Sequence, residues 1–175
     1  VSVELPQKDS ARLLELVESG ALNEYGVTRY IDPIETELRQ NVITERNFRE
    51  ALQSWYNIEE LGKSILTYLN IVKHQQSLAG YPDTDTGRAL ALGDVLSNVV
   101  DEAISAQPIK YTILHDHYRS GKTTTELAHV YSISFSGLYM RLNLARRDIH
   151  ERLIKLEMQY IHSAKSQSNI EDHQN

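Results

Sequence analysis

Apolar residues recur every three to four positions along most of this 175-residue chain, which is the spacing of one helix face. The longest series runs through residues 44–76, where the intervals between apolar positions alternate between three and four. An unbroken stripe of this kind predicts one long amphipathic helix. Shorter series predict helices at residues 10–20, at 86–107 and from Pro108 toward Gly121. With no strand-rich segment, the sequence predicts an all-α fold.

The stripe of the long predicted helix has two interpretations. It packs on other helices of its own chain, or it joins two chains in a coiled coil or dimer interface. In the second case the residues for self-association or protein contact are Phe48, Trp55, Ile58, Ile65, Leu69 and Val72. Gly62 lies on the same stripe and favours a close helix crossing over a regular zipper.

Residues that typically begin and end helices divide the chain further. Asp32 is placed as an N-cap, with Pro33 at the first helical position and Glu35 three residues after the cap. Turn-forming residues at 79–87 predict a loop or linker. We therefore expect an N-terminal helical region (1–78), a C-terminal helical domain (88–162) and a disordered tail (163–175).

Charge is also unevenly distributed along the chain, with a division at a different point. Residues 1–109 contain nine Lys and Arg against 17 Asp and Glu, a net charge of −8, whereas residues 110–158 contain eight against five, a net of +3. Such asymmetry is expected when one segment faces a polyanion. There is no cysteine, no apolar run of membrane-spanning length and no signal-peptide pattern at the start of the sequence. A cytoplasmic protein without a membrane contact is the expectation.

Residues 123–149 carry the most specific local pattern. Thr123 with Glu126 forms a capping box that opens a short helix through Val130, and Ser134 caps a second helix that begins at Phe135. The second helix has a predicted buried stripe, which consists of Leu138, Leu142, Ala145 and Ile149. A short helix, a tight turn and a longer helix of this proportion predict a helix-turn-helix.

Residues 118–149, YRSGKTTTELAHVYSISFSGLYMRLNLARRDI, resemble region four of sigma factors and the phage regulators that share it. The matching elements are Tyr-x-x-Gly, T-x-x-E-L-A, S-I-S and R-L-N-x-A-R. Residues 29–52 are similar to the N-terminal part of phage late-gene activators of the RinA/ArpU type. This resemblance implies a C-terminal DNA-binding unit and cooperation with RNA polymerase. No counterpart of the promoter-melting region is present, so a sigma factor acting alone is not expected.

The second helix departs from the pattern of the family, because uncharged side chains occupy its outward positions. The resemblance places the N-terminal face of this helix in the major groove, where the base-reading residues would be Phe135, Ser136, Tyr139, Met140 and Asn143. Phe contacts a thymine methyl, and hydroxyl groups bond several base edges. None of these groups makes the bidentate guanine contact of Arg, so we expect a preference for A/T with readout of DNA shape. A further departure is Ser132, where glycine is frequent.

Phosphate contacts would anchor the unit. The candidates are Arg119, Lys122, Thr123, Thr124, Thr125, Ser134, Arg141, Arg146 and Arg147, helped by a helix N-terminus. About five phosphate contacts from a segment of net charge +3 give weak binding per copy, which favours a homodimer on two half-sites or a polymerase partner. Arg146 and Arg147 could instead be solvated or paired along the helix.

The sequence gives little support for an enzyme, a metal site or a cofactor. His115 and His117 are two residues apart, which directs them about 200° apart on a helix. RSGKTT lacks the earlier glycine and the strand of a phosphate-binding loop. The leading interpretation is a sequence-specific transcription regulator that binds double-stranded DNA. The alternatives are a DNA-packaging subunit of the small-terminase type and a protein that binds or sequesters another protein through the aromatic face.

Overall fold

The computed structural model describes residues 32–171, and every regular element within that range is helical. The elements are α2 (Pro33–Glu37), the π-helical turn η1 (Leu38–Val42), α3 (Glu45–Gln53), α4 (Ile58–Leu61), the 3-10 turn η2 (Ile65–Tyr68), α5 (Asn70–Ala79), α6 (Asp85–Ala106), α7 (Pro108–Tyr118), α8 (Thr124–Val130) and α9 (Phe135–Glu171). The all-α prediction is confirmed for this range. The helix expected at 10–20 lies outside the described residues.

The single long helix predicted for residues 44–76 is wrong. This segment folds as α3, α4, η2 and α5, because polar side chains cap new helix starts inside it. Asn57 Oδ1 accepts from the backbone N–H groups of Glu59 and Glu60 at 3.1 and 3.3 Å. Ser64 Oγ accepts from the N–H of Leu66 at 3.2 Å. The apolar spacing persists through these breaks because each short helix buries one face in the same core.

The predicted self-association residues divide into two groups. Phe48, Trp55, Leu69 and Val72 are buried inside their own chain. Ile58 and Ile65 are 40% and 47% exposed. The six side chains therefore form no continuous outer stripe, and four of them cannot meet a partner in this fold.

The loop expected at 79–87 joins two neighbouring helices of the unit that spans residues 37–175. α5 ends at Ala79, where Gly80 adopts a left-handed φ of 68°, and α6 begins at Asp85. α5 and α6 then pack against each other. Gly87 makes this return possible, since a Cβ atom there would lie 1.9 Å from the carbonyl oxygen of Pro82. The loop therefore connects elements of one unit and does not separate two domains.

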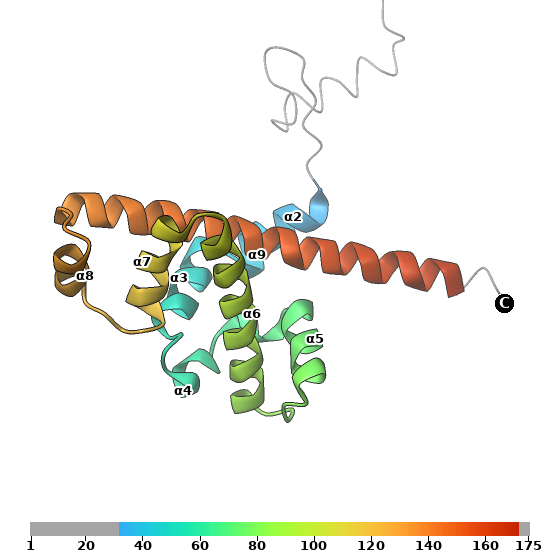
Figure 1. Cartoon of the computed structure of the whole chain (residues 1–175). Helices are drawn as coiled ribbons and strands as arrows, with labels where there is room; N and C mark the ends of the chain where they lie inside the picture. The colour runs from blue at the N-terminus through green and yellow to red at the C-terminus, as the bar shows by residue number, and fades with distance from the viewer. Residues whose placement is uncertain (1–31, 172–175) are drawn as a thin grey trace, which may run out of the picture. The chain divides into compact units, whose positions relative to one another are not determined.

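α6 and α9 organise the core of residues 37–171. α6 packs against α4, α5, α7 and α9, and α9 also contacts α3, α5, α7 and α8 (Figure 1). A buried carboxylate joins two of these elements. Glu157 of α9 is 1% exposed, and its oxygens accept from the backbone N–H groups of Asn70 and Ile71 at 2.9 and 3.0 Å. A side chain 87 residues away thus caps the start of α5.

Further contacts position α9 within residues 37–171. Arg39 pairs with Glu151 through two bonds of 2.5 and 2.6 Å, and Lys110 pairs with Asp148. His150 is buried against Phe48, with its Nε2 atom 2.5 Å from the carbonyl oxygen of Ile43.

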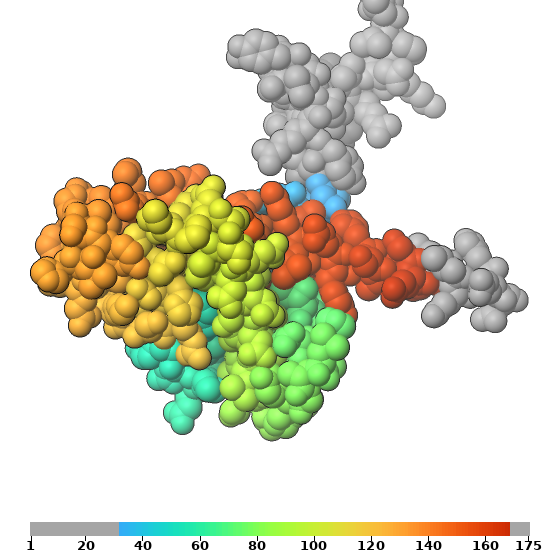
Figure 2. Space-filling model, viewed as in Figure 1, coloured from blue at the N-terminus to red at the C-terminus, as the bar shows by residue number. Residues whose placement is uncertain are grey.

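The prediction of a disordered tail from residue 163 is wrong as far as residue 171, because α9 continues to Glu171. Figures 1 and 2 show this last part of α9 extending past α5. The side chains of residues 162–168 are exposed, which explains why the sequence there is polar.

Candidate nucleic-acid interface

α8 begins with the capping box that the sequence predicts. Thr123 Oγ1 accepts from the N–H of Glu126 at 3.2 Å, and the Glu126 carboxylate accepts from the N–H of Thr123 at 2.7 Å. The N–H of Thr123 and, at 2.9 Å, its hydroxyl both donate to the Glu126 carboxylate and lower the pKa of that carboxyl below its ordinary value. The start of α8 is therefore fixed by two reciprocal bonds.

The turn after α8 brings the chain to the start of α9. Ser132, at the turn position where the sequence pattern led us to expect glycine, adopts a φ of 51°, in the left-handed region that glycine occupies most easily. Ser134 Oγ then accepts from the N–H of Gly137 at 3.1 Å, which caps α9 at the predicted residue. The predicted boundaries at Thr123, Val130, Ser134 and Phe135 are thus confirmed.

The inner side of α9 is buried as predicted. Leu138, Leu142, Ala145 and Ile149 are all less than 5% exposed, and Leu127 of α8 is fully buried. α8 packs on both α7 and α9. The first turns of α9 are therefore held against α8 and the body of the protein.

The opposite side of these turns is exposed. We call Phe135, Ser136, Tyr139, Met140 and Asn143 the open face of α9. Its large side chains are exposed by 53% at Phe135, 53% at Tyr139 and 61% at Met140. Ser136 and Asn143 are exposed as well. All five predicted base-reading residues therefore lie together on one accessible surface.

The predicted phosphate contacts do not all lie beside the open face. An α-helix turns about 100° per residue, so Arg146 and Arg147 lie within about 60° of Asn143 around the helix axis, whereas Arg141 lies about 160° away from it. Arg141 instead lines a cleft of about 520 Å³ with Ile109, Leu144 and the start of α7. Arg146 and Arg147 border a small recess shared with Glu45 and His150.

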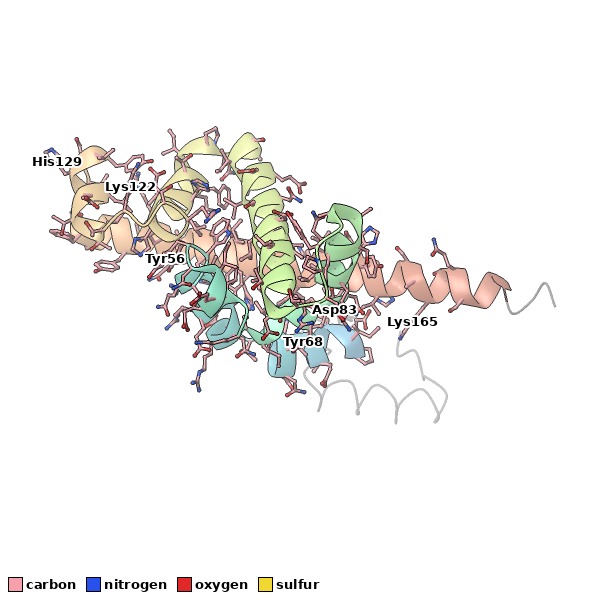
Figure 3. The ribbon with its side chains drawn as sticks, turned by 90° about the horizontal axis from the view of Figure 1, so that it is seen from below. Tyr56, Tyr68, Asp83, Lys122, His129 and Lys165 are labelled. Atoms are coloured by element: carbon pink, nitrogen blue, oxygen red, sulfur yellow. The ribbon has the colours of Figure 1, made fainter. Side chains whose placement is uncertain are left out.

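Two further cations are bonded inside the chain. The Lys122 ammonium lies 2.9 Å from the carboxylate of Asp116, and the Arg119 guanidinium lies 3.5 Å from the carbonyl oxygen of Trp55. Figure 3 shows Lys122 at the connection between α7 and α8, with His129 on the outer side of α8.

The hydroxyl groups that were predicted to contact phosphate also differ in their surroundings. Thr123 and Ser134 serve as caps, Thr125 is exposed and Thr124 is half-buried.

Sequence reasoning missed the residues that attach α8 to α7. Asp116 of α7 accepts from Lys122 and also from the Tyr131 hydroxyl at 3.2 Å. The peptide N–H of Lys122 donates to the carbonyl of Asp116 at 3.0 Å. The signal in the sequence was Gly121, which lies between the oppositely charged Asp116 and Lys122. Glycine readily adopts a positive φ, here 69°, and so allows the chain to reverse and bring the two side chains together.

The two histidines of α7 have separate contacts. His115 meets the ring of Trp55 edge-on with centroids 5.9 Å apart, and His117 Nδ1 lies 2.9 Å from the carbonyl oxygen of Lys122. Within residues 32–171, no three His, Cys, Asp or Glu side chains are grouped so that they could hold a metal ion.

Comparison with known proteins finds no matching family model, no matching curated protein and no matching solved structure. No helix in the described part of the chain is long and apolar enough to cross a membrane.

Proposed function

We propose that the protein is a sequence-specific regulator of transcription that binds double-stranded DNA through a helix-turn-helix formed by α8 and α9. In this proposal the N-terminal turns of α9 enter the major groove. The resemblance to sigma region four and to phage late-gene activators extends the proposal to a regulator that acts with RNA polymerase.

The observation that carries the proposal is the open face of α9. Phe135, Tyr139 and Met140 are more than half exposed, although the other side of the same turns is fully buried. A helix held rigidly on one side and exposed on the other has the geometry that groove insertion requires. The neighbouring Arg146 and Arg147 provide positive charge within one turn of Asn143.

The chemistry of this face favours A/T-containing sites. The Phe135 ring can pack on a thymine methyl, and the hydroxyls of Ser136 and Tyr139 can bond base edges or phosphates. Guanine recognition by Arg is missing from the face. We therefore expect modest direct readout, supplemented by the shape and deformability of the site.

Affinity would come from phosphate contacts, and few cations are placed to make them. Arg146 and Arg147 lie beside the open face, whereas Arg119 and Lys122 have bonds within the chain. Because each phosphate contact adds only a small salt-dependent increment, one copy would bind weakly. Two copies on two half-sites, or a polymerase partner, would supply the remaining affinity.

Selection of bound fragments from random duplex DNA at two salt concentrations tests this function. The expected result is an enriched motif that is rich in A/T and whose affinity falls as salt rises. Recovery of unenriched sequence with the same salt dependence would reduce the function to non-specific binding. No recovery at either salt concentration would contradict it.

A second function is supported by the same surface. Three exposed apolar side chains on one helix face also suit the binding of another protein. If this function holds, Phe135→Ala with Tyr139→Ala removes a protein contact and leaves any DNA affinity unchanged. If the DNA-binding function holds, the double substitution weakens DNA binding.

A further inference from the structure

The contact between Asp116 and Lys122 has a consequence for the proposed DNA-binding function. Lys122 is the residue just before the capping box of α8, where the sequence predicts a phosphate contact. Its ammonium is instead 2.9 Å from the carboxylate of Asp116. A lysine paired in this way presents almost no net charge to an approaching phosphate.

The surroundings of Asp116 stabilise the pair. The Asp116 side chain is only 17% exposed, so separation of the pair would leave a poorly solvated carboxylate. The Tyr131 hydroxyl donates to the same carboxylate oxygen at 3.2 Å. Burial, followed by the charge of Asp116, raises the pKa of Tyr131, which therefore remains a neutral donor.

The backbone brings the two charges together. Gly121 turns the chain with a positive φ, and the N–H of Lys122 donates to the carbonyl of Asp116. His117 Nδ1 lies 2.9 Å from the carbonyl oxygen of Lys122. Both ends of the Lys122 peptide are thus fixed, and its side chain needs little further ordering to reach Asp116. The hydrogen bond to Asp116 raises the pKa of Lys122 above its ordinary value, which keeps the ammonium charged.

We propose that Asp116 is an autoinhibitory residue that takes the place of a DNA phosphate at Lys122 and so limits the sequence-independent part of the DNA affinity. The bound state requires either that Lys122 remains paired or that it leaves the Asp116 carboxylate without the lysine that balances its charge. Both outcomes weaken phosphate binding. Arg146 and Arg147 then supply the main phosphate contacts. This inference rests on the proposed function.

Binding of the full-length protein to a duplex of random sequence, measured over a series of salt concentrations, tests the inference. Asp116→Asn should raise the affinity several-fold at low salt and steepen the slope of log affinity against log salt by about 0.9, the increment for one new phosphate contact. Asp101→Asn, which neutralises an exposed carboxylate of α6, is the control for a general change in charge.

Lys122→Gln makes the test specific and does not depend on the folding of the Asp116 variant. In the wild-type background it should hardly change the salt slope, whereas Arg147→Gln should reduce the slope by about 0.9. In the double variant Asp116→Asn, Lys122→Gln, the gain produced by Asp116→Asn should disappear. Tyr131→Phe keeps the ion pair and should leave the slope unchanged.

The outcomes separate this inference from the function on which it rests. If the wild-type protein binds DNA and Lys122→Gln flattens the slope as much as Arg147→Gln does, Lys122 already contacts phosphate and the inference is overturned. The same holds if the gain from Asp116→Asn persists without Lys122. If neither the wild-type protein nor any variant binds DNA, the proposed function and the inference fail together.

Discussion

The first four turns of α9 and the turns that follow them differ in where apolar and polar side chains lie. From Phe135 to Arg147 the outward side carries exposed aromatic and apolar groups, whereas further along the helix the buried side includes the carboxylate of Glu157. The polar group is inside because it completes the N-terminus of α5. The apolar groups are outside without a partner in the described structure. Stability should therefore depend on the middle of α9 and the helices around it, and ligand binding on its beginning.

The largest expected effect tests the stable region. Gly87→Ala places a Cβ atom against the backbone of Pro82, which cannot move without opening the loop between α5 and α6. We expect a loss of about 3 kcal/mol in the free energy of unfolding, measured by urea denaturation. Gly93→Ala in the same helix is the matched control, because its Cβ atom would be 3.9 Å from Leu61 and ordinary helix propensity favours Ala. Equal stability of the two variants would contradict the close approach.

Glu157→Ala tests the long-range cap. The substitution leaves the N–H groups of Asn70 and Ile71, the second of them buried, without their acceptor at the start of α5, so the free energy of unfolding should fall by about 2 kcal/mol. Glu102→Ala removes an exposed carboxylate and should change stability little. Because residue 157 is far from the open face, the DNA affinity of the folded fraction should stay within about twofold of wild type. A large loss of that affinity would contradict the proposal that the middle of α9 serves stability and its beginning serves ligand binding.

Ser132→Gly addresses the turn between α8 and α9. Glycine accepts the observed φ of 51° without steric cost but loses more entropy on folding, so the net gain in stability should be about 1 kcal/mol or less. Thermal unfolding of the variant measures it. A loss of stability would contradict this expectation, because the Ser132 side chain would then stabilise the fold by more than the strained backbone at this residue destabilises it.

Acid produces the smallest and most gradual effect. Hydrogen bonds from Thr123, Lys110 and Arg39 lower the pKa values of Glu126, Asp148 and Glu151, respectively. A carboxyl group with a lowered folded-state pKa stabilises the fold above its unfolded-state pKa and loses that contribution as pH falls. Stability should therefore decline from about pH 5 toward pH 3, and salt should reduce the effect because these groups are partly exposed. Unchanged stability over this range would contradict the contribution of these bonds.

Local patterns predicted both ends of α8 and the start of α9 because each depends on neighbouring residues. The capping box needs only Thr123 and Glu126, and the inner stripe of α9 follows from helical periodicity. The break-up of the segment 44–76 was missed because apolar spacing outweighed the cap signals of Asn57 and Ser64. Those side chains interrupt a helix without altering the spacing of its buried positions.

Contacts between distant residues could not be predicted from the sequence. The cap of α5 by Glu157 joins residues 87 positions apart, and nothing in either local sequence indicates the other. The same applies to Arg119, whose guanidinium lies near the carbonyl of Trp55. The open face of α9 was predictable as a set of outward positions, because it is the complement of the buried stripe. Its ligand was inferred from a resemblance and from side-chain chemistry.

The most direct test of the account is the affinity of Phe135→Ala, Tyr139→Ala for the duplex enriched by selection. Tyr56→Ala, Ile58→Ala removes an equal number of exposed apolar side chains elsewhere and serves as the control. We expect both double variants to have a free energy of unfolding within about 0.5 kcal/mol of wild type. Only the α9 variant should lose affinity for the duplex, by about tenfold or more. Unchanged affinity of the α9 variant would contradict the assignment of this face to DNA.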